Sequence, residues 1–191
     1  DKKGLTVVEV INKILEDEIK GMYIMGENPA MSDPDQNHAR EALAKLDHLV
    51  VQDIFMTETA WHADVILPSS AHAEKTGTFT NTNRQVQLGR QAVPPPGDAR
   101  QDWWITQAIA QRMGLDWSYL HPRDVFNEMA QVMPSLKNIT YERLEHENSV
   151  TYPCDDPNKP GNEIIFNEKF PTANGRGKIV PARLIPPAEL P

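Results

Sequence analysis

Polar side chains that could hold a small ligand stand just after short apolar segments of this chain. They are Asn28, Asp53, Thr57 and Lys75, with a further carboxylate, Asp102, in "RQDWW". An amide or hydroxyl can bond ribose and phosphate oxygens, and a lysine meets phosphate as a point charge. A carboxylate can accept two parallel bonds from guanine's ring N–H and amino group, a donor pair that adenine lacks. The set therefore favours a nucleotide, although no G-x-G-x-x-G or G-K-[ST] motif is present.

Strands and helices that alternate along the first half of the chain would bring these side chains together. Apolar runs predict short strands at 22–25, 48–51 and 65–67. A capping-box pattern predicts a helix over 6–18, and Ser32 with Pro34 predicts the start of a second helix. This alternation implies a parallel sheet, in which ligands bind outside the carboxyl ends of the strands. We expect Asn28, Asp53, Thr57 and Lys75 to face one crevice.

The second half of the chain divides into a helical part and an irregular one. After a long polar loop (69–82), the pattern predicts a strand over 84–90 and a helix over 99–113 capped by Asp98. Further helices are expected near 122–132 and 140–147. The last 44 residues hold eight of the sixteen prolines, which is typical of an extended strap. The prediction is an α/β domain over 1–147, with a doubly wound, mainly parallel sheet, followed by a Pro-rich segment over 148–191.

Each candidate residue also has a purely structural interpretation. Asn28-Pro29 can be an ordinary turn, Asp53 can cap the next helix, and Lys75 can be a solvated surface charge. Asp102 can complement a helix dipole. Taken singly these interpretations are the commoner ones, and only the convergence at successive strand ends favours a binding site.

Charge and composition restrict the kinds of partner. The formal net charge is −8, from 19 basic and 27 acidic side chains without a basic stripe, which argues against nucleic acid and anionic membranes. No apolar run approaches the ~20 residues of a membrane span. The single cysteine, Cys154, fits a cytoplasmic setting and excludes an internal disulfide. The ends, Asp1-Lys2-Lys3-Gly4 and a Pro-rich tail, lead us to expect an internal fragment of a longer protein.

Other reactive residue types give no pattern of an active site. The six histidines lack the spacing of a zinc site, and Ser69-Ser70 lacks a nucleophile elbow. Trp103 and Trp104 fit packing better than base stacking. Cys154 has no basic neighbour in sequence to lower its pKa. We therefore predict neither catalytic residues nor metal ligands in this chain.

Three stretches of the sequence resemble a known family. "GMYIMGENPAMSDPD", "LVVQDIFMTETAWHADVILPSSAHAEKTGTFTNTNRQVQ" and "PGDARQDWW" are similar to the catalytic alpha subunit of molybdenum-dependent formate dehydrogenases, within the dimethyl sulfoxide reductase family of molybdopterin oxidoreductases. The likeness extends over essentially the whole chain and is strongest to NAD-linked, cytoplasmic enzymes. It departs at Asn83-Arg84-Gln85, where relatives often place an acidic residue and paired arginines, so local ionic contacts there are not expected to match.

The resemblance implies a fold, a cofactor and site residues. The family's third domain is a Rossmann-like α/β unit that grips the guanosine end of one of two molybdopterin guanine dinucleotides carrying molybdenum. By position, the cofactor contacts would be Asn28, Gln52, Asp53, Thr57, Lys75 and Asp102. The iron–sulfur cysteines, the molybdenum ligand and the residues acting on formate would lie outside this chain. The chain alone would then catalyse nothing.

The resemblance also implies partners and leaves alternatives open. Formate would be oxidised to carbon dioxide, with electrons passing through molybdenum and iron–sulfur clusters to NAD. The partners would be the other domains of the subunit and NAD- or flavin-binding electron-transfer subunits. One alternative is a molybdenum-free scaffold domain of a respiratory NADH dehydrogenase iron–sulfur subunit. Another is a sibling molybdopterin reductase acting on nitrate or a different oxyanion.

Overall fold

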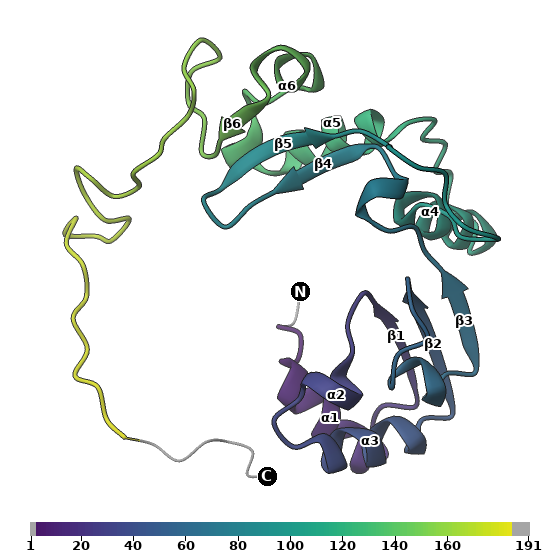
Figure 1. Ribbon diagram of the computed structural model, residues 1–191. Helices are drawn as coiled ribbons and strands as arrows, with labels where there is room; N and C mark the ends of the chain where they lie inside the picture. The colour runs from purple at the N-terminus through teal and green to yellow at the C-terminus, as the bar shows by residue number, and fades with distance from the viewer. Residues whose placement is uncertain (1–2, 185–191) are drawn as a thin grey trace. The chain divides into compact units, whose positions relative to one another are not determined.

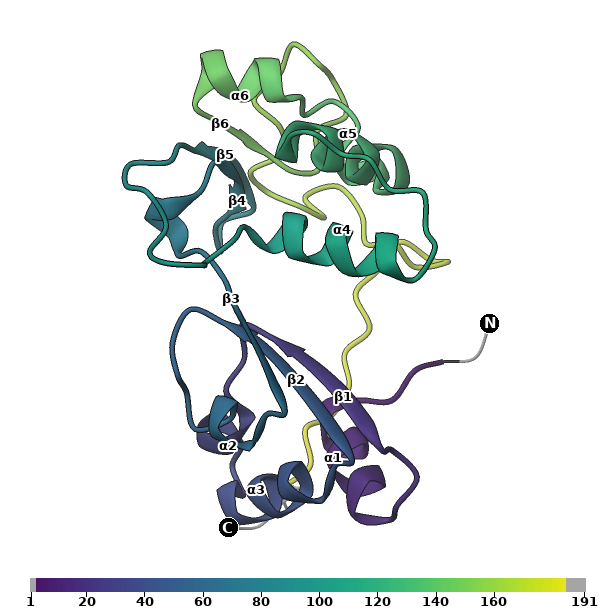
Figure 2. The ribbon, with the colours of Figure 1, turned by 90° about the vertical axis from the view of Figure 1, so that its right-hand side faces the viewer.

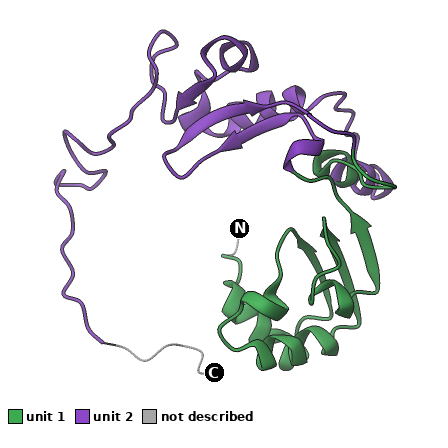
Figure 3. Cartoon of the chain, viewed as in Figure 1, with its two compact units in different colours: residues 1–71, 95–105, 185–191 green, residues 72–94, 106–184 purple. Residues whose placement is uncertain are grey.

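The chain forms two compact units that alternate along the sequence. A computed structural model describes residues 3–184. The first unit holds the residues up to Ala71 together with Pro95–Ile105, and the second holds His72–Pro94 and Thr106–Leu184 (Figure 3). These compact units do not test the predicted division of the chain into a domain over 1–147 and a Pro-rich segment over 148–191. That division stays a prediction.

The first unit is built on a three-stranded parallel sheet with the order β1-β2-β3 (Figure 1). The strands are β1 (Gly21–Met25), β2 (His48–Asp53) and β3 (Val65–Pro68), joined by α2 (Pro29–Ser32), α3 (Gln36–Lys45) and the 3₁₀ turn η1 (Ala60–His62). Helix α1 (Val7–Leu15) precedes the sheet, and Thr6 and Glu9 form the predicted capping box at its start. The helices pack on one face of the sheet (Figure 2).

Alternation along the strands decides which face of this sheet is buried. Ile24 of β1 and Val51 of β2 are buried, and they pack with Ala30 and Leu43 from the helices. Tyr23, on the opposite face, remains 43% exposed. Successive side chains of a strand point to opposite faces, so the apolar core of the unit lies on the helix side.

The second unit is built on an antiparallel sheet with the order β4-β5-β6. Strands β4 (Gly77–Thr80) and β5 (Gln85–Gly89) form a hairpin, and β6 (Ser149–Thr151) pairs with β5. Helices α5 (Pro122–Val132) and α6 (Tyr141–Glu147), with the 3₁₀ turns η2 (His72–Glu74) and η3 (Pro134–Leu136), belong to the same unit. Its core contains Val86, Phe126, Leu144 and Val150.

The α/β class and the parallel sheet are confirmed, but several predicted elements were wrong in detail. The antiparallel sheet was not predicted, because the supposed loop 69–82 contains η2 and strand β4, whose Gly-Thr-Phe-Thr sequence has only one strongly apolar residue. Helix α3 begins after Asp35, whose side chain caps it, rather than at Ser32. Helix α4 (Asp102–Arg112) begins at Asp102 and not after Asp98. The predicted helices near 122–132 and 140–147 are confirmed.

The buried contact between α3 and the sheet gives a stability prediction. Leu43 is 1% exposed and packs against β1 and β2, so Leu43→Ala should lower the free energy of unfolding by about 2–5 kcal/mol. Urea denaturation followed by circular dichroism measures this loss. The control Val7→Ala removes a side chain that is 66% exposed and should change stability by roughly 0.5 kcal/mol at most. Equal losses in the two variants would contradict the packing described.

Candidate functional site

The carboxyl ends of the three parallel strands meet at one edge of the first unit. Met25 pairs in register with Gln52, and Gln52 pairs with Leu67. The Gly26 N–H donates to the Gln52 carbonyl at 2.9 Å, with Gly26 at φ 65°, where glycine carries no steric penalty. An isolated bridge between Ser69 and Arg100 brings the segment that leads into α4 beside the end of β3. Polar residues far apart in the sequence therefore converge at this edge.

Gln52 is the buried centre of that convergence. Its side chain is 0% exposed, and its Nε2 donates to Asp102 Oδ1 at 2.8 Å. The Tyr23 hydroxyl donates to Gln52 Oε1. Of the predicted residues, Gln52 and Asp102 are therefore in direct contact, across fifty positions of sequence. Tyr23, which was not predicted, completes the network.

Asp102 brings a negative charge to the first turn of α4. The Gln101 carbonyl accepts from the Trp104 and Ile105 N–H groups, so the helix is established from its first residues. A carboxylate at a helix N-terminus is favoured by the helix dipole, which supports the structural interpretation of Asp102 as well. The bond from Gln52 adds a fixed orientation that a dipole alone does not supply. Asp102 is therefore a partly exposed carboxylate held in a defined direction.

Asn28 ties the turn after β1 to the turn after β2. Its Oδ1 accepts from the Thr59 N–H at 3.1 Å and from Thr59 Oγ1 at 2.8 Å, and its Nδ2 donates to Glu58 Oε2 at 2.7 Å. Thr59 Oγ1 in turn accepts from the Ala30 N–H in α2. These hydrogen bonds, all within the first unit, account for the conformation of the "GENP" turn. Whether Asn28 also contacts a cofactor stays a prediction.

Asp53 and Thr57 make local bonds at the end of β2. Asp53 Oδ1 accepts from the Ile54 N–H at 2.7 Å, and Thr57 Oγ1 accepts from the Ala60 N–H at 3.2 Å. Both side chains are half-buried, and both lie in the first unit with Gln52. The bonds stabilise the turn that leads into η1. Their predicted contacts with a ligand are not tested by this geometry.

Lys75 is the one predicted residue that falls in the second unit. It follows η2 directly and precedes β4, and it is half-buried there. The expectation that it shares a crevice with Asn28, Asp53 and Thr57 therefore stays a prediction.

Tyr23 could have been found from the strand pattern. Tyr23 pairs with Val50, and Met25 pairs with Gln52, so Tyr23 and Gln52 lie diagonally on the same face of the sheet. Burial raises the pKa of the Tyr23 hydroxyl, and the negative charge of Asp102 raises it further. Tyr23 therefore keeps its proton at neutral pH and acts as a hydrogen-bond donor.

Two other kinds of feature are absent from residues 3–184. In this part of the chain, no three His, Cys, Asp or Glu side chains gather in a way that could hold a metal ion. Nor does any helix within these residues have the length and apolar character needed to cross a membrane.

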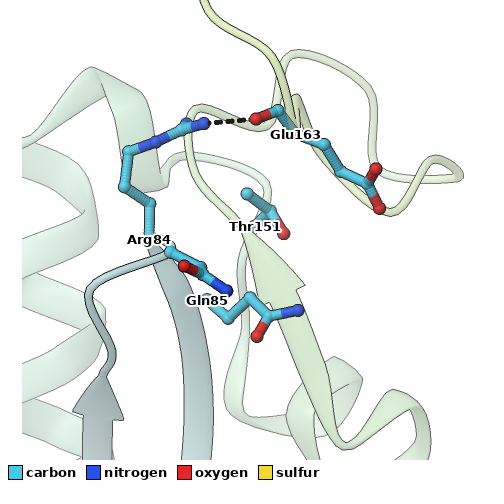
Figure 4. A pocket seen from close by; sticks show the side chains of 5 residues that line it. Arg84, Gln85, Thr151 and Glu163 are labelled. Atoms are coloured by element: carbon cyan, nitrogen blue, oxygen red, sulfur yellow. Dashed lines mark hydrogen bonds between the residues drawn. The ribbon is translucent and has the colours of Figure 1, made fainter.

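A polar cavity of about 490 Å³ lies in the second unit, beside the tip of the β4–β5 hairpin (Figure 4). The residues that line it are Asn83, Arg84, Gln85, Thr151 and Glu163. The Arg84 guanidinium donates to the carbonyls of Asn162, at 3.0 Å, and Glu163, at 2.7 Å, and also to that of Tyr152. Arg84 therefore fastens the segment after β6 to the hairpin through neutral carbonyl groups.

The Arg84 contacts predict how the segment after β6 is held. Arg84→Lys keeps the charge but loses the planar fork, so amides in this segment should exchange roughly tenfold to a hundredfold faster. The reporters are the Thr151 N–H, bonded to the Pro160 carbonyl, and the Asn162 N–H, bonded to the Pro153 carbonyl. Hydrogen exchange by NMR measures both. The control Arg112→Lys alters an arginine bonded within its own helix and should leave both rates unchanged.

The bond between Asn28 and Glu58 predicts a shift in titration. The hydrogen bond from Asn28 is the largest cause that lowers the pKa of Glu58. Its stabilising effect is present above the unfolded-state pKa and is lost as the pH falls through the folded-state value. Asn28→Ala should therefore raise the pKa of Glu58, and Asn28→Asp should raise it further by adding a like charge. Carboxyl-carbon NMR titration measures the shift.

Glu147 supplies the internal control for that titration. Its pKa is lowered by a hydrogen bond from Arg143 in the second unit, and it should not change in either Asn28 variant. A Glu58 pKa that stays the same in both variants would contradict the contact described.

The sequence of this chain is similar to a known protein family and to individual members of it. The Molybdopterin oxidoreductase family profile matches residues 1–112. The chain is 50% identical over 190 residues to the F420-dependent formate dehydrogenase subunit alpha of Methanocaldococcus jannaschii, covering 98% of this chain and 28% of that protein. It is 46% identical over 180 residues to the F420-dependent formate dehydrogenase 2 subunit alpha of Methanococcus maripaludis, covering 93% of this chain and 26% of that protein. The chain thus spans about a quarter of the length of these relatives.

A solved structure supports the fold. Acetylene hydratase from Pelobacter acetylenicus superimposes with a TM-score of 0.61 at 22% identity, over 76% of this chain and 20% of that protein. At this identity the likeness concerns the fold alone. The family profile over residues 1–112 and the identity to two formate dehydrogenase alpha subunits lead to one conclusion: the chain belongs to the molybdopterin oxidoreductase family.

Proposed function

We propose that this chain is the part of a formate dehydrogenase alpha subunit that holds the guanosine end of a molybdopterin guanine dinucleotide. Support comes from the relatives, two of which are named as formate dehydrogenase alpha subunits. The first unit would then correspond to the family's Rossmann-like third domain. The cofactor, when bound, supplies the two-electron chemistry at its metal, and the residues of this chain bind and orient its nucleotide end.

The Gln52–Asp102 hydrogen bond is the observation that carries the proposal. It holds a carboxylate in one direction at the carboxyl edge of a parallel sheet, where nucleotides bind in α/β folds. An ionised carboxylate accepts several hydrogen bonds at once, so its bond with Gln52 is compatible with accepting from a base. Guanine offers two parallel donors, its ring N–H and its amino group, whereas adenine offers no such pair. The carboxylate of Asp102, which only accepts, thus fits guanine.

The remaining predicted residues have different roles in the proposal. Asn28 would act mainly by fixing the turn beside the site, because its amide bonds Glu58 and Thr59. Thr57 would meet ribose or phosphate oxygens, Asp53 would accept from N–H or O–H donors of the nucleotide, and Lys75 would meet a phosphate. These contacts with the cofactor, like those of Gln52 and Asp102, rest on the chemistry of the residues and on the family resemblance.

The reaction of the longer protein would be the oxidation of formate to carbon dioxide, a proton and two electrons. No residue of this chain is assigned a catalytic role in that reaction. Iron–sulfur clusters outside the chain and electron-transfer subunits would carry the electrons onward, in the cytoplasm. NAD is the acceptor that the sequence resemblance implies. The two relatives compared above are named for dependence on F420, so F420 is the competing acceptor.

Nucleotide selectivity tests the proposal directly. Calorimetric titration of the chain should show GDP binding at least about tenfold more tightly than ADP, because charged hydrogen bonds contribute roughly 1.5–3 kcal/mol. Asp102→Asn should lose this preference. The same variant should gain affinity for xanthosine diphosphate, because an asparagine amide can donate to the oxygen that replaces the guanine amino group. This gain of affinity for xanthosine diphosphate would show that the variant still binds a nucleotide, so the lost GDP preference could not be attributed to damage of the site.

The result that would overturn the proposal is equally specific. Equal binding of GDP and ADP, or a GDP preference that survives in Asp102→Asn, would remove the guanine-binding role of Asp102. Failure to bind either nucleotide would favour the scaffold alternative, in which the domain has no base to recognise.

A further inference from the structure

A continuous line of polar side chains links the first strand of the parallel sheet to the start of α4. The Tyr23 hydroxyl donates to Gln52 Oε1, and Gln52 Nε2 donates to Asp102 Oδ1 at 2.8 Å. Gln52 is 0% exposed, so its amide cannot exchange these partners for water. Both ends of the line are more accessible, since Tyr23 is 43% exposed and Asp102 is half-buried.

The direction of every donor in this line is determined by chemistry. An ionised aspartate only accepts, so Gln52 must turn its NH₂ group toward Asp102. The Gln52 carbonyl then faces Tyr23, whose hydroxyl must donate to it. Burial and the charge of Asp102 raise the pKa of Tyr23, so that its proton is retained at neutral pH. Reversing the Gln52 amide would set its carbonyl against the carboxylate.

We propose that Tyr23 and Gln52 are positioning residues that fix the orientation of the Asp102 carboxylate for a guanine base. The inference rests on the proposed function, because it assigns the support of the same site. An aspartate side chain rotates broadly about its last bond, so an unsupported carboxylate would present its two oxygens in many directions. One bond from a buried amide selects a single direction before the ligand arrives. Selectivity for guanine then depends on a tyrosine that need not touch the base.

Tyr23→Phe tests this dependence with little disturbance of packing. The variant keeps the ring and removes only the hydroxyl, so the Gln52 carbonyl loses the donor that fixes its position and the amide can tilt away from its best alignment with Asp102. Inosine diphosphate, which lacks the guanine amino group, is the comparison ligand because it isolates the second of the two bonds to Asp102. The preference for GDP over inosine diphosphate should fall about threefold to tenfold in calorimetric titration. The control Tyr119→Phe removes a hydroxyl bonded to Glu128 in the second unit and should leave the preference unchanged.

Gln52→Glu adds a second measurement, the dependence of the GDP preference on pH. This dependence would not appear if Gln52 served only to stabilise the fold. The introduced carboxyl group is buried beside Asp102, so burial and the like charge raise its pKa. When protonated it can donate to Asp102 as the amide does, and when ionised it repels Asp102. The GDP preference should therefore be several-fold stronger at about pH 5.5 than at about pH 8 in this variant. The wild-type ratio should not show this dependence, because both ligands carry the same titrating diphosphate.

The outcomes separate this inference from the function on which it rests. Loss of preference in Asp102→Asn, Tyr23→Phe and Gln52→Glu at high pH would support both. A preference that disappears in Asp102→Asn but stays intact in the folded Tyr23→Phe chain would overturn the positioning role and leave the proposed function standing. Absence of any guanine preference in the wild type would overturn both. If Gln52→Glu does not fold, Tyr23→Phe decides alone.

Discussion

The buried amide of Gln52 is the constraint on which the arrangement of the candidate site depends. At the end of the central strand, its side chain is closed off from water and must find one acceptor and one donor inside the unit. A buried polar group without a partner costs about 1–3 kcal/mol, which is a large part of the stability of a small unit. Asp102 and Tyr23 meet this requirement from a helix and a neighbouring strand. The start of α4 is therefore tied to the sheet by polar bonding.

A second network fixes the turns around that amide. Asn28 accepts two bonds from Thr59, and Thr59 accepts from the Ala30 N–H. The carbonyl of Gln52 accepts from Gly26, so both loops at the edge are joined to β2 or to each other. Such cross-links leave these loops few alternative conformations, and pre-organised groups lose less entropy when a ligand binds.

The sequence predicted the elements whose signals are local and missed those that depend on tertiary contacts. Periodic apolar residues and the Thr6–Glu9 capping box identified α1, and short apolar runs identified the parallel strands. Strand β4 was missed, because it acquires strand structure by pairing with β5 and has little apolar pattern of its own. Asp98 looks like a helix cap in sequence, yet the Ser69–Arg100 bridge keeps the chain extended and delays α4 to Asp102. Gln52 and Asp102 were candidates, but their contact and the part of Tyr23 required the register of the sheet.

The polarity of the helix ends at this edge explains why a glycine-rich phosphate loop is absent. Helix α2 has four residues, and its Ala30 N–H is already bonded to Thr59, so it offers little to a phosphate. Helix α4 begins with Asp102, whose negative charge would repel a phosphate from that helix end. The same charge attracts the N–H edge of a neutral base. The two helix ends at this edge therefore offer little to a phosphate, and a search for phosphate-binding motifs cannot detect the carboxylate acceptor that Asp102 supplies there.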